Sequence, residues 1–257
     1  MMKKLTVVSL VFLSAAAQAQ SHLDRVMKTK TLTVCATGDY KPYTHLLQDG
    51  KYEGIDVALM ENLATSLGAT VKWQKTTWKT LMEDFRSKQC DIAVGGISVI
   101  LKRQQTAWLS APIAVDGKIP LVRCDDKAKY QTIEQLNKPT VRLIAPFGGT
   151  NEAFVQRYLP KAQLQLTHDN AAIFQQIIDK KFDVMVTDAS EALYQQKQYP
   201  KLLCALNPKR PLQYIEKAYM LPRDDMSWKL YVDQWLHLNK KTGVYQDIVA
   251  EWIAIPK

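Results

Sequence analysis

The chain of 257 residues is long enough for one large domain or two smaller lobes. Its formal net charge of +9 would suit nucleic acid, but Lys and Arg are scattered along the sequence rather than clustered. This pattern indicates a solvated surface with a bias towards small anionic molecules. Four cysteines without a CxxC pair, and four histidines far apart in the sequence, argue against a metal site.

Residues 1–19 have the pattern of a secretory signal peptide. Lys3 and Lys4 precede an apolar stretch, residues 5–17, and Ala17-Gln18-Ala19 is an A-x-A cleavage site. The apolar stretch is too short to span a membrane, and no later segment is long enough. We therefore predict a periplasmic protein without membrane insertion. Export argues further against nucleic acid as a partner, and it permits disulfides.

Along the rest of the chain, short apolar runs alternate with segments of helical spacing. The expected strands are residues 31–36, 70–75, 91–94, 140–145, 163–167, 184–186 and 202–205. The expected helices are residues 23–28, 55–67, 78–86, 102–107, 132–136, 151–158 and 170–179, the stretch after Asp188, and residues 224–241 and 244–253. Strands and helices at this spacing are typical of βαβ units.

Two extended runs, residues 116–123 and 212–221, carry no helical pattern and divide this alternation. We therefore predict an α/β fold of the two-lobed, periplasmic-binding-protein-like (type II) kind, with a central cleft and two hinge strands. Lobe 1 would consist of residues 20–116 and 213–257, and lobe 2 of residues 117–212. Hinges of this kind permit closure of the lobes on a ligand.

Four strand ends carry polar residues or glycines and are candidates for the cleft: residues 37–43, 95–98, 148–151 and 187–188. In open α/β sheets the carboxyl ends of the strands face the ligand crevice. Glycines let the backbone approach a ligand closely, and helix starts offer free N–H groups to an anion. The nucleotide and nucleophile patterns GxGxxG, GxxxxGK[ST] and GxSxG are absent.

Several candidate side chains have a structural interpretation beside the functional one. Asp188 and Glu191 have the spacing of a capping box, which the spacing alone favours over chemistry. Arg103 can grip a carboxylate with two parallel hydrogen bonds or form a surface salt bridge. Trp78 can stack on a ring, but core packing is the safer interpretation. Lys118, on the first extended run, faces either the cleft floor or solvent.

The motifs GDYKPY at residues 38–43, GIDVALMENLA at 54–64 and GGIS at 95–98 resemble those of periplasmic amino-acid-binding proteins of the type II fold. Three further runs, FQQIIDKKFDVMVTDASEA, EKAYMLPRD and YVDQWLH, resemble one branch, the periplasmic cyclohexadienyl (arogenate/prephenate) dehydratases. This resemblance covers nearly the whole mature chain.

The resemblance implies a cofactor-free, decarboxylative dehydration of small anionic substrates: prephenate to phenylpyruvate, and arogenate to phenylalanine. It implies Glu191 as the general acid, with Lys118 beside it in the catalytic machinery. The implied substrate contacts are Asp39, Trp78, Ser98, Arg103, Thr150, Asn151 and Asp188. Glu191 must then be protonated near neutral pH; burial would raise its pKa, whereas the helix N-terminus and nearby cations would lower it.

One position departs from the dehydratase pattern, because Pro146 stands where that branch has an asparagine. Proline offers no polar side chain to a substrate. This departure motivates the alternative function, a non-enzymatic amino-acid- or carboxylate-binding protein of an ABC transporter.

The cysteines fall into two pairs. Cys124 follows the first extended run and Cys204 precedes the second, so both lie near the hinge side of lobe 2, and the resembling dehydratases carry cysteines in these contexts. We expect a disulfide between them. Cys35 and Cys90 lie in or beside neighbouring strands of lobe 1, where we favour buried free thiols over a second bridge.

Overall fold

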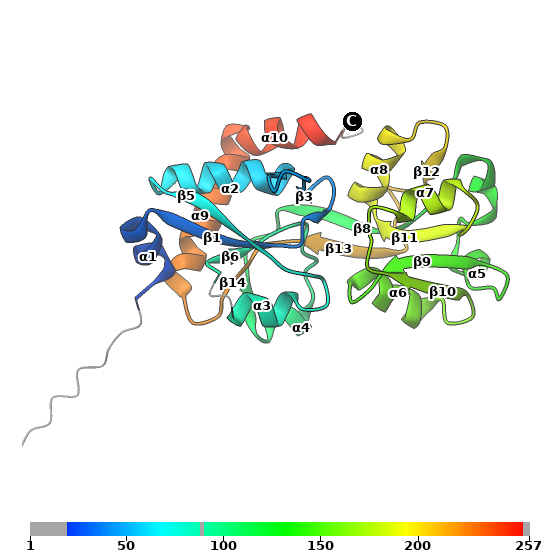
Figure 1. The fold of residues 1–257 in the computed structure, drawn as a ribbon, viewed down its shortest axis with the longest axis horizontal. Coiled ribbons are helices and arrows are strands. Elements are labelled where there is room, and N and C mark those ends of the chain that lie inside the picture. The colour runs from blue at the N-terminus through cyan, green and yellow to red at the C-terminus, as the bar shows by residue number, and fades with distance from the viewer. Residues whose placement is uncertain (1–19, 88–89, 254–257) are drawn as a thin grey trace, which may run out of the picture.

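The computed structural model describes residues 20–87 and 90–253, so the predicted signal peptide lies outside the described residues. Two α/β lobes lie side by side along the long axis, and strands β8 (Ala114–Arg123) and β13 (Gln213–Lys217) run between them (Figure 1). The two-lobed architecture predicted from the sequence is therefore confirmed. None of the helices in the described part of the chain is long and apolar enough to cross a membrane.

Lobe 1 is built on a five-stranded sheet with the order β5-β1-β6-β14-β7. The strands are β1 (Thr31–Ala36), β5 (Thr70–Lys75), β6 (Ile92–Ala93), β7 (Ala107–Leu109) and β14 (Met220–Pro222). The helices are α1 (His22–Thr29), α2 (Ile55–Ser66), α3 (Leu81–Ser87), α4 (Leu101–Gln104), α9 (Met226–Thr242) and α10 (Val244–Trp252). Fully buried Val34, Leu59 and Trp228 belong to the core that joins α2 and α9 to this sheet. Burial of such apolar side chains is the main stabilising contribution.

Lobe 2 has a sheet with the order β10-β9-β11-β8-β12, and β13 also pairs with β8. The strands are β8 (Ala114–Arg123), β9 (Arg142–Pro146), β10 (Gln163–Thr167), β11 (Val184–Asp188), β12 (Leu203–Ala205) and β13 (Gln213–Lys217). The helices are the 3-10 helix η1 (Cys124–Lys129), α5 (Ile133–Leu136), α6 (Thr150–Tyr158), α7 (Ile173–Ile178) and α8 (Ala189–Gln198). Parallel β9, β10 and β11 point their carboxyl ends towards lobe 1, which places α6 and α8 with their N-termini at the boundary between the lobes (Figure 1).

Most expected elements are present, and the differences have local causes. The helix predicted for residues 102–107 is wrong beyond Gln104, because Ala107–Leu109 pairs with β14, which is distant in the sequence. The helix predicted from residue 78 begins at Leu81, so Trp78 lies in the preceding loop. The small antiparallel sheet of β2 (Asp39–Tyr40), β3 (Thr44–Leu46) and β4 (Tyr52–Glu53) was not predicted.

The two extended runs are confirmed as β8 and as β13 followed by β14. Because β8 and β13 pair with each other and run through the boundary between the lobes, they have the arrangement expected of the two hinge strands. The lobe limits at residues 116/117 and 212/213 remain a prediction.

Two disulfides are present. The expected bridge between Cys124 and Cys204 is confirmed, with a Cα–Cα distance of 4.9 Å. The prediction of free thiols at Cys35 and Cys90 is wrong: these residues are also bridged, with a Cα–Cα distance of 5.8 Å. The pairing of β1 with β6 brings the two cysteines together, and both distances lie in the range that a disulfide requires.

Peptide mapping of the unreduced, denatured protein should therefore find all four cysteines protected from alkylation and two cross-linked peptide pairs, Cys35 with Cys90 and Cys124 with Cys204. The same digest after reduction is the control and should release four alkylated peptides. Alkylation of Cys35 and Cys90 without reduction would restore the free-thiol interpretation.

Candidate active site

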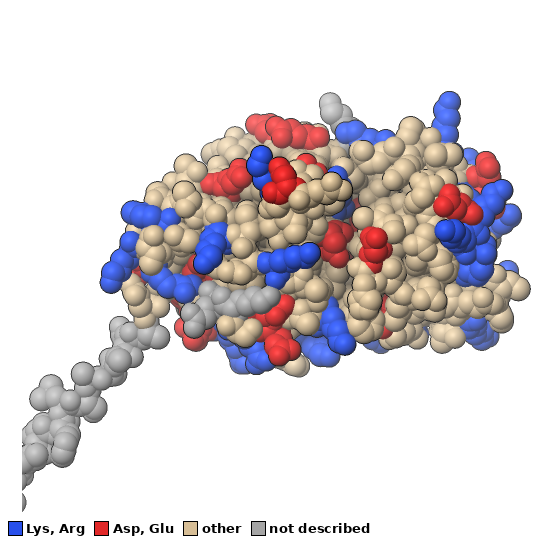
Figure 2. Space-filling view, viewed as in Figure 1, with Lys and Arg blue, Asp and Glu red and all other residues tan. Residues whose placement is uncertain are grey.

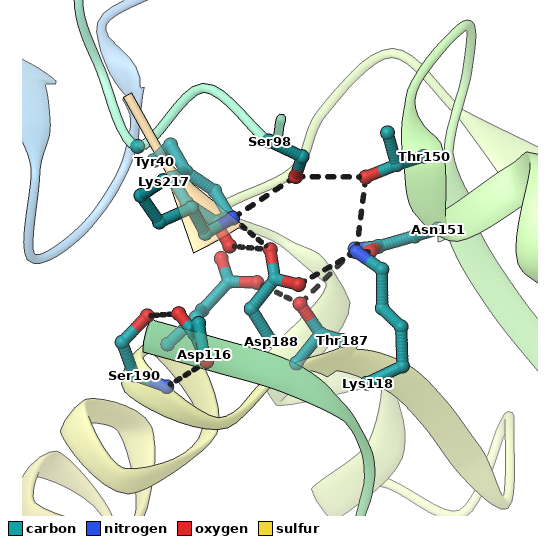
Figure 3. A network of polar contacts seen from close by, with 12 residues as sticks. Tyr40, Ser98, Asp116, Lys118, Thr150, Asn151, Thr187, Asp188, Ser190 and Lys217 are labelled. Carbon is teal, nitrogen blue, oxygen red and sulfur yellow. Dashed lines mark hydrogen bonds and ion pairs between the residues drawn. The ribbon is translucent and has the colours of Figure 1, made fainter. Parts of the chain in front are cut away.

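A small cavity of about 20 Å³ lies between the lobes and is lined from both of them. Tyr40, Trp78 and Ser98 contribute from lobe 1, and Thr150 and Asp188 from lobe 2. Pro146, Gly96, Gly149 and Asn151 complete the lining. Ser98 Oγ and Thr150 Oγ1 lie 3.5 Å apart across the boundary, so the strand ends predicted to face the cleft do meet there (Figure 3).

The centre of the site is the carboxylate of Asp188, at the end of β11. Lys118 Nζ lies 2.8 Å from its Oδ1, and Lys217 Nζ donates to its Oδ2 at 2.5 Å (Figure 3). The hydroxyl of Tyr40 also donates to Oδ2 at 2.5 Å. Burial alone would raise the pKa of Asp188, but the two ammonium groups outweigh it and hold this pKa well below its usual range. Asp188 is therefore ionised at any physiological pH.

A directed chain of hydrogen bonds joins Lys118 to Glu191. Lys118 Nζ donates to Asn151 Oδ1, which turns the amide so that Asn151 Nδ2 donates to Thr187 Oγ1 at 3.0 Å. The hydroxyl of Thr187 then donates its single proton to Glu191 Oε2. Since the lysine ammonium can only donate, Lys118 fixes which group donates and which accepts in every later hydrogen bond of this series. The chain therefore fixes one carboxyl oxygen of Glu191 as an acceptor.

Glu191 lies in the first turn of α8 and is only 1% exposed. Burial raises its pKa to about 8, and the charge of Asp188 adds to this rise, against the opposing effects of the Thr187 hydroxyl and the Lys118 ammonium. Glu191 is thus mostly protonated at neutral pH, so the question that the sequence left open is answered in favour of burial. A buried carboxyl group with such a raised pKa is suited to donate a proton.

The capping-box interpretation of Asp188 and Glu191 is wrong. Asp188 makes no side-chain cap bond to α8, because its oxygens are engaged by Lys118, Lys217 and Tyr40. The cap is supplied instead by Asp116 of β8, which accepts from the backbone N–H of Ser190 at 3.2 Å and from its hydroxyl at 2.5 Å. A capping box is present instead at the start of α5, formed by Thr132 and Gln135.

Arg103 is buried, which excludes the surface salt bridge. One guanidinium nitrogen, Nη1, donates to the Ser98 carbonyl at 2.7 Å. Burial lowers its pKa to about 10, so it keeps its charge at neutral pH. Among the described residues no carboxylate forms an ion pair with it. Arg103 lies behind Ser98 rather than in the cavity lining, and a buried cation in this position calls for an anionic partner.

The remaining predicted residues divide between the cleft and its edges. Trp78 lines the cavity and also packs on both lobe 1 cores, with its ring edge-on to Tyr40 at 5.4 Å, so each of its two interpretations holds in part. Thr150 accepts from Lys118 Nζ at 3.0 Å. Asp39 lies outside the cleft cavity and lines a neighbouring one, together with Glu191 and His45.

Sequence reasoning missed Lys217, and it placed Tyr40 and Thr187 in predicted cleft segments without naming either as a site residue. Lys217 had a usable signal, because it lies on the second extended run just as Lys118 lies on the first, and the argument applied to Lys118 covers both. Tyr40 is part of the GDY motif, and Thr187 precedes the singled-out Asp188. Elsewhere, Lys and Arg side chains are spread over both lobes and interspersed with Asp and Glu, as the sequence indicated (Figure 2).

The chain matches the model of a family described as bacterial extracellular solute-binding proteins, family 3, over residues 32–255. A curated relative, the cyclohexadienyl dehydratase of Pseudomonas aeruginosa, is 45% identical over 241 residues, which cover 93% of this chain and 89% of the relative. A probable amino-acid ABC transporter-binding protein of Haemophilus influenzae is 24% identical over 245 residues, 93% of this chain and 91% of that protein.

Two solved structures of reconstructed ancestors are also similar. One is an ancestral amino-acid-binding protein described as a precursor of cyclohexadienyl dehydratase, with 30% identity, a TM-score of 0.83, and coverage of 91% of this chain and 100% of that chain. The other is an ancestral cyclohexadienyl dehydratase, with 41% identity, a TM-score of 0.59, and coverage of 93% and 98%.

Proposed function

The chain belongs to family 3 of the bacterial extracellular solute-binding proteins, and we propose that it uses the ligand cleft of this fold as the active site of a cyclohexadienyl dehydratase. The substrates are prephenate and arogenate, and the products are phenylpyruvate and phenylalanine. The observation that carries this proposal is Glu191, a buried and protonated carboxyl group joined through Thr187 and Asn151 to the cations of the cleft. Binding a solute requires no proton donor, whereas the dehydration does.

The chemistry needs little beyond positioning and one proton. Prephenate carries two carboxylates and a ring hydroxyl. As the ring C–CO2 bond breaks, its electron pair enters the ring, and the hydroxyl leaves from the opposite carbon. Glu191 gives its proton to this hydroxyl, which departs as water, and the aromatic product supplies the driving force. A general acid contributes about 10²–10⁴ in rate. No cofactor takes part in these steps.

The cations hold the substrate carboxylates. Lys118, Lys217 and the buried Arg103 come from three different segments, and all approach the cavity from its Ser98 and Thr150 side. Tyr40 and Trp78 form an aromatic wall, and Pro146 contributes an apolar surface where a polar side chain was expected. Substrate orientation therefore relies on the charged groups and on Thr150 and Asn151, rather than on position 146.

The protein acts in the periplasm. Its family consists of extracellular solute-binding proteins, and residues 1–19 have the composition of a cleaved signal peptide. The two disulfides fit this oxidising compartment.

The second candidate function is a carboxylate- or amino-acid-binding component of a transporter, and the apolar Pro146 and the binder-like ancestor favour it. Incubation of the purified mature protein with prephenate distinguishes these two functions. The formation of phenylpyruvate is followed by its absorbance. We expect catalysed release of phenylpyruvate above the spontaneous rate. Tight binding of a free amino acid without turnover would overturn the dehydratase assignment.

Arg103→Ala should raise the KM for prephenate by roughly 10–100-fold with a smaller effect on kcat. A hydrogen bond to a charged group contributes about 1.5–3 kcal/mol, and here it is made to substrate and transition state alike. Steady-state kinetics measure the two constants. Arg103→Lys is the matched control: it keeps the charge but loses the fork of donors, and it should fall between wild type and alanine. An unchanged KM in Arg103→Ala would remove Arg103 from the binding site.

A further inference from the structure

Lys217 is a fully buried lysine at the end of the second hinge strand. Its ammonium donates to Asp188 Oδ2 at 2.5 Å and to Ser98 Oγ at 3.2 Å, and it lies 5.4 Å from the centre of the Tyr40 ring (Figure 3). A buried ammonium costs free energy unless it is paired, and Asp188 provides that pairing. Strand β13 thus places the Lys217 ammonium directly against the Asp188 carboxylate.

The consequence for Asp188 is that a lysine ammonium lies against each of its oxygens. Oδ1 faces Lys118, and Oδ2 accepts from Lys217 and Tyr40. A ligand ammonium group can reach this carboxylate only by displacing a lysine that the fold already holds there. Since Glu191 keeps its proton, it does not offer a second carboxylate in the cleft.

The other buried carboxyl groups near Lys217 are already hydrogen-bonded. Asp116 accepts from the backbone N–H and the hydroxyl of Ser190, and Asp56 accepts from two backbone N–H groups and from the Tyr219 hydroxyl. Neither of them lines the cavity, whose lining contains the carboxylate of Asp188. A substrate ammonium in this cavity therefore meets only a carboxylate that two lysines already contact.

We propose that Lys217 determines substrate class, making the site selective for the 2-oxo dianion prephenate over arogenate, whose ammonium group reduces its net charge to −1. This inference rests on the proposed dehydratase function. Arogenate must either leave its ammonium without a carboxylate partner in this cavity or compete with Lys217 for Asp188. Either cost is large enough for at least about a tenfold preference in kcat/KM, since a hydrogen bond to a charged group is involved.

The test is kcat/KM for both substrates in wild type and in Lys217→Met, which keeps the length of the side chain and removes its charge. Wild type should prefer prephenate by about tenfold or more. The variant should lose about 10–100-fold on prephenate and clearly less on arogenate, because Asp188 Oδ2 becomes available to the substrate ammonium. The ratio of the two constants should therefore fall. Lys51→Met, at a lysine that is 79% exposed, is the matched control and should leave both constants unchanged.

Three outcomes overturn the proposal. A wild-type ratio near or below one, or an equal loss on both substrates in Lys217→Met, contradicts the role of Lys217 while leaving the dehydratase function intact. Turnover of neither substrate by wild type contradicts the dehydratase function and, with it, this inference. The wild-type ratio needs no variant, so it decides the matter even if Lys217→Met does not fold.

Discussion

Glu191→Gln should lower kcat for prephenate by about 10²–10⁴-fold while substrate binding is nearly kept. Glutamine has the shape of the protonated acid, and its amide oxygen can still accept from the Thr187 hydroxyl, so the chain from Lys118 stays connected. What is lost is the proton for the departing hydroxyl. Single-turnover kinetics with prephenate measure the chemical step, and isothermal titration with a non-reactive aromatic dicarboxylate measures binding.

The pH dependence gives a second, independent readout of the same group. Burial raises the pKa of Glu191 to about 8, so the fraction of enzyme that carries the acidic proton declines as the pH rises through this value. In wild type, kcat/KM should fall about tenfold per pH unit above pH 8. The residual activity of Glu191→Gln should lack this fall, because no proton is left to lose at position 191.

The same raised pKa predicts a stability effect whose sign can be checked. A group whose folded-state pKa lies above its unfolded value stabilises the fold below the unfolded pKa, and this contribution is lost as the pH rises through the folded pKa. Wild type should therefore lose stability relative to Glu191→Gln as the pH rises to about 8. Chemical denaturation at several pH values measures the difference.

Glu134→Gln is the matched control, since Glu134 is an exposed glutamate in the first turn of α5. It should change neither kcat nor its pH profile. If Glu191→Gln turns over prephenate at a rate close to that of wild type, Glu191 is a structural residue and another group supplies the proton.

The sequence predicted best where a pattern is read from one segment. The strand–helix alternation and the two extended runs each depend on neighbours within a few residues, and both are present. The strand Ala107–Leu109 was missed because its only reason to be extended is β14, which lies far along the chain. Local helical spacing at residues 102–107 gave no sign of that partner.

The candidate site shows the same limit in its electrostatics. Spacing alone favoured Asp188 as a helix cap. It could not reveal the two lysines that contact the Asp188 oxygens, because they lie on separate hinge strands. The cap itself came from Asp116, a residue that no local pattern connects with α8. The raised pKa of Glu191 likewise depends on its burial in the folded protein. Family resemblance could place these residues, but only the three-dimensional arrangement gives their charge states.

Asp188→Ala should lower the free energy of unfolding by about 3–5 kcal/mol and abolish most of the activity. The substitution leaves Lys118 and Lys217 buried without their carboxylate, and an uncompensated buried charge carries a penalty of this size. Urea denaturation at pH 7 measures the loss. A deficit below about 1 kcal/mol would mean that the lysines find other partners or water.

Two comparisons identify the cause of that loss. Removing both cations as well, in Asp188→Leu with Lys118→Met and Lys217→Met, should restore much of the stability, because buried ion pairs can be replaced by apolar groups at little cost.

Raising the pH should also reduce the loss of unfolding free energy in Asp188→Ala. Burial already lowers the pKa of Lys118, and without Asp188 its deprotonation becomes easier still. A group with a lowered folded-state pKa binds fewer protons when folded, so stability increases with pH. If the triple variant is active towards neither substrate yet folds as well as wild type, the Asp188 ion pairs serve catalysis at no net gain in stability.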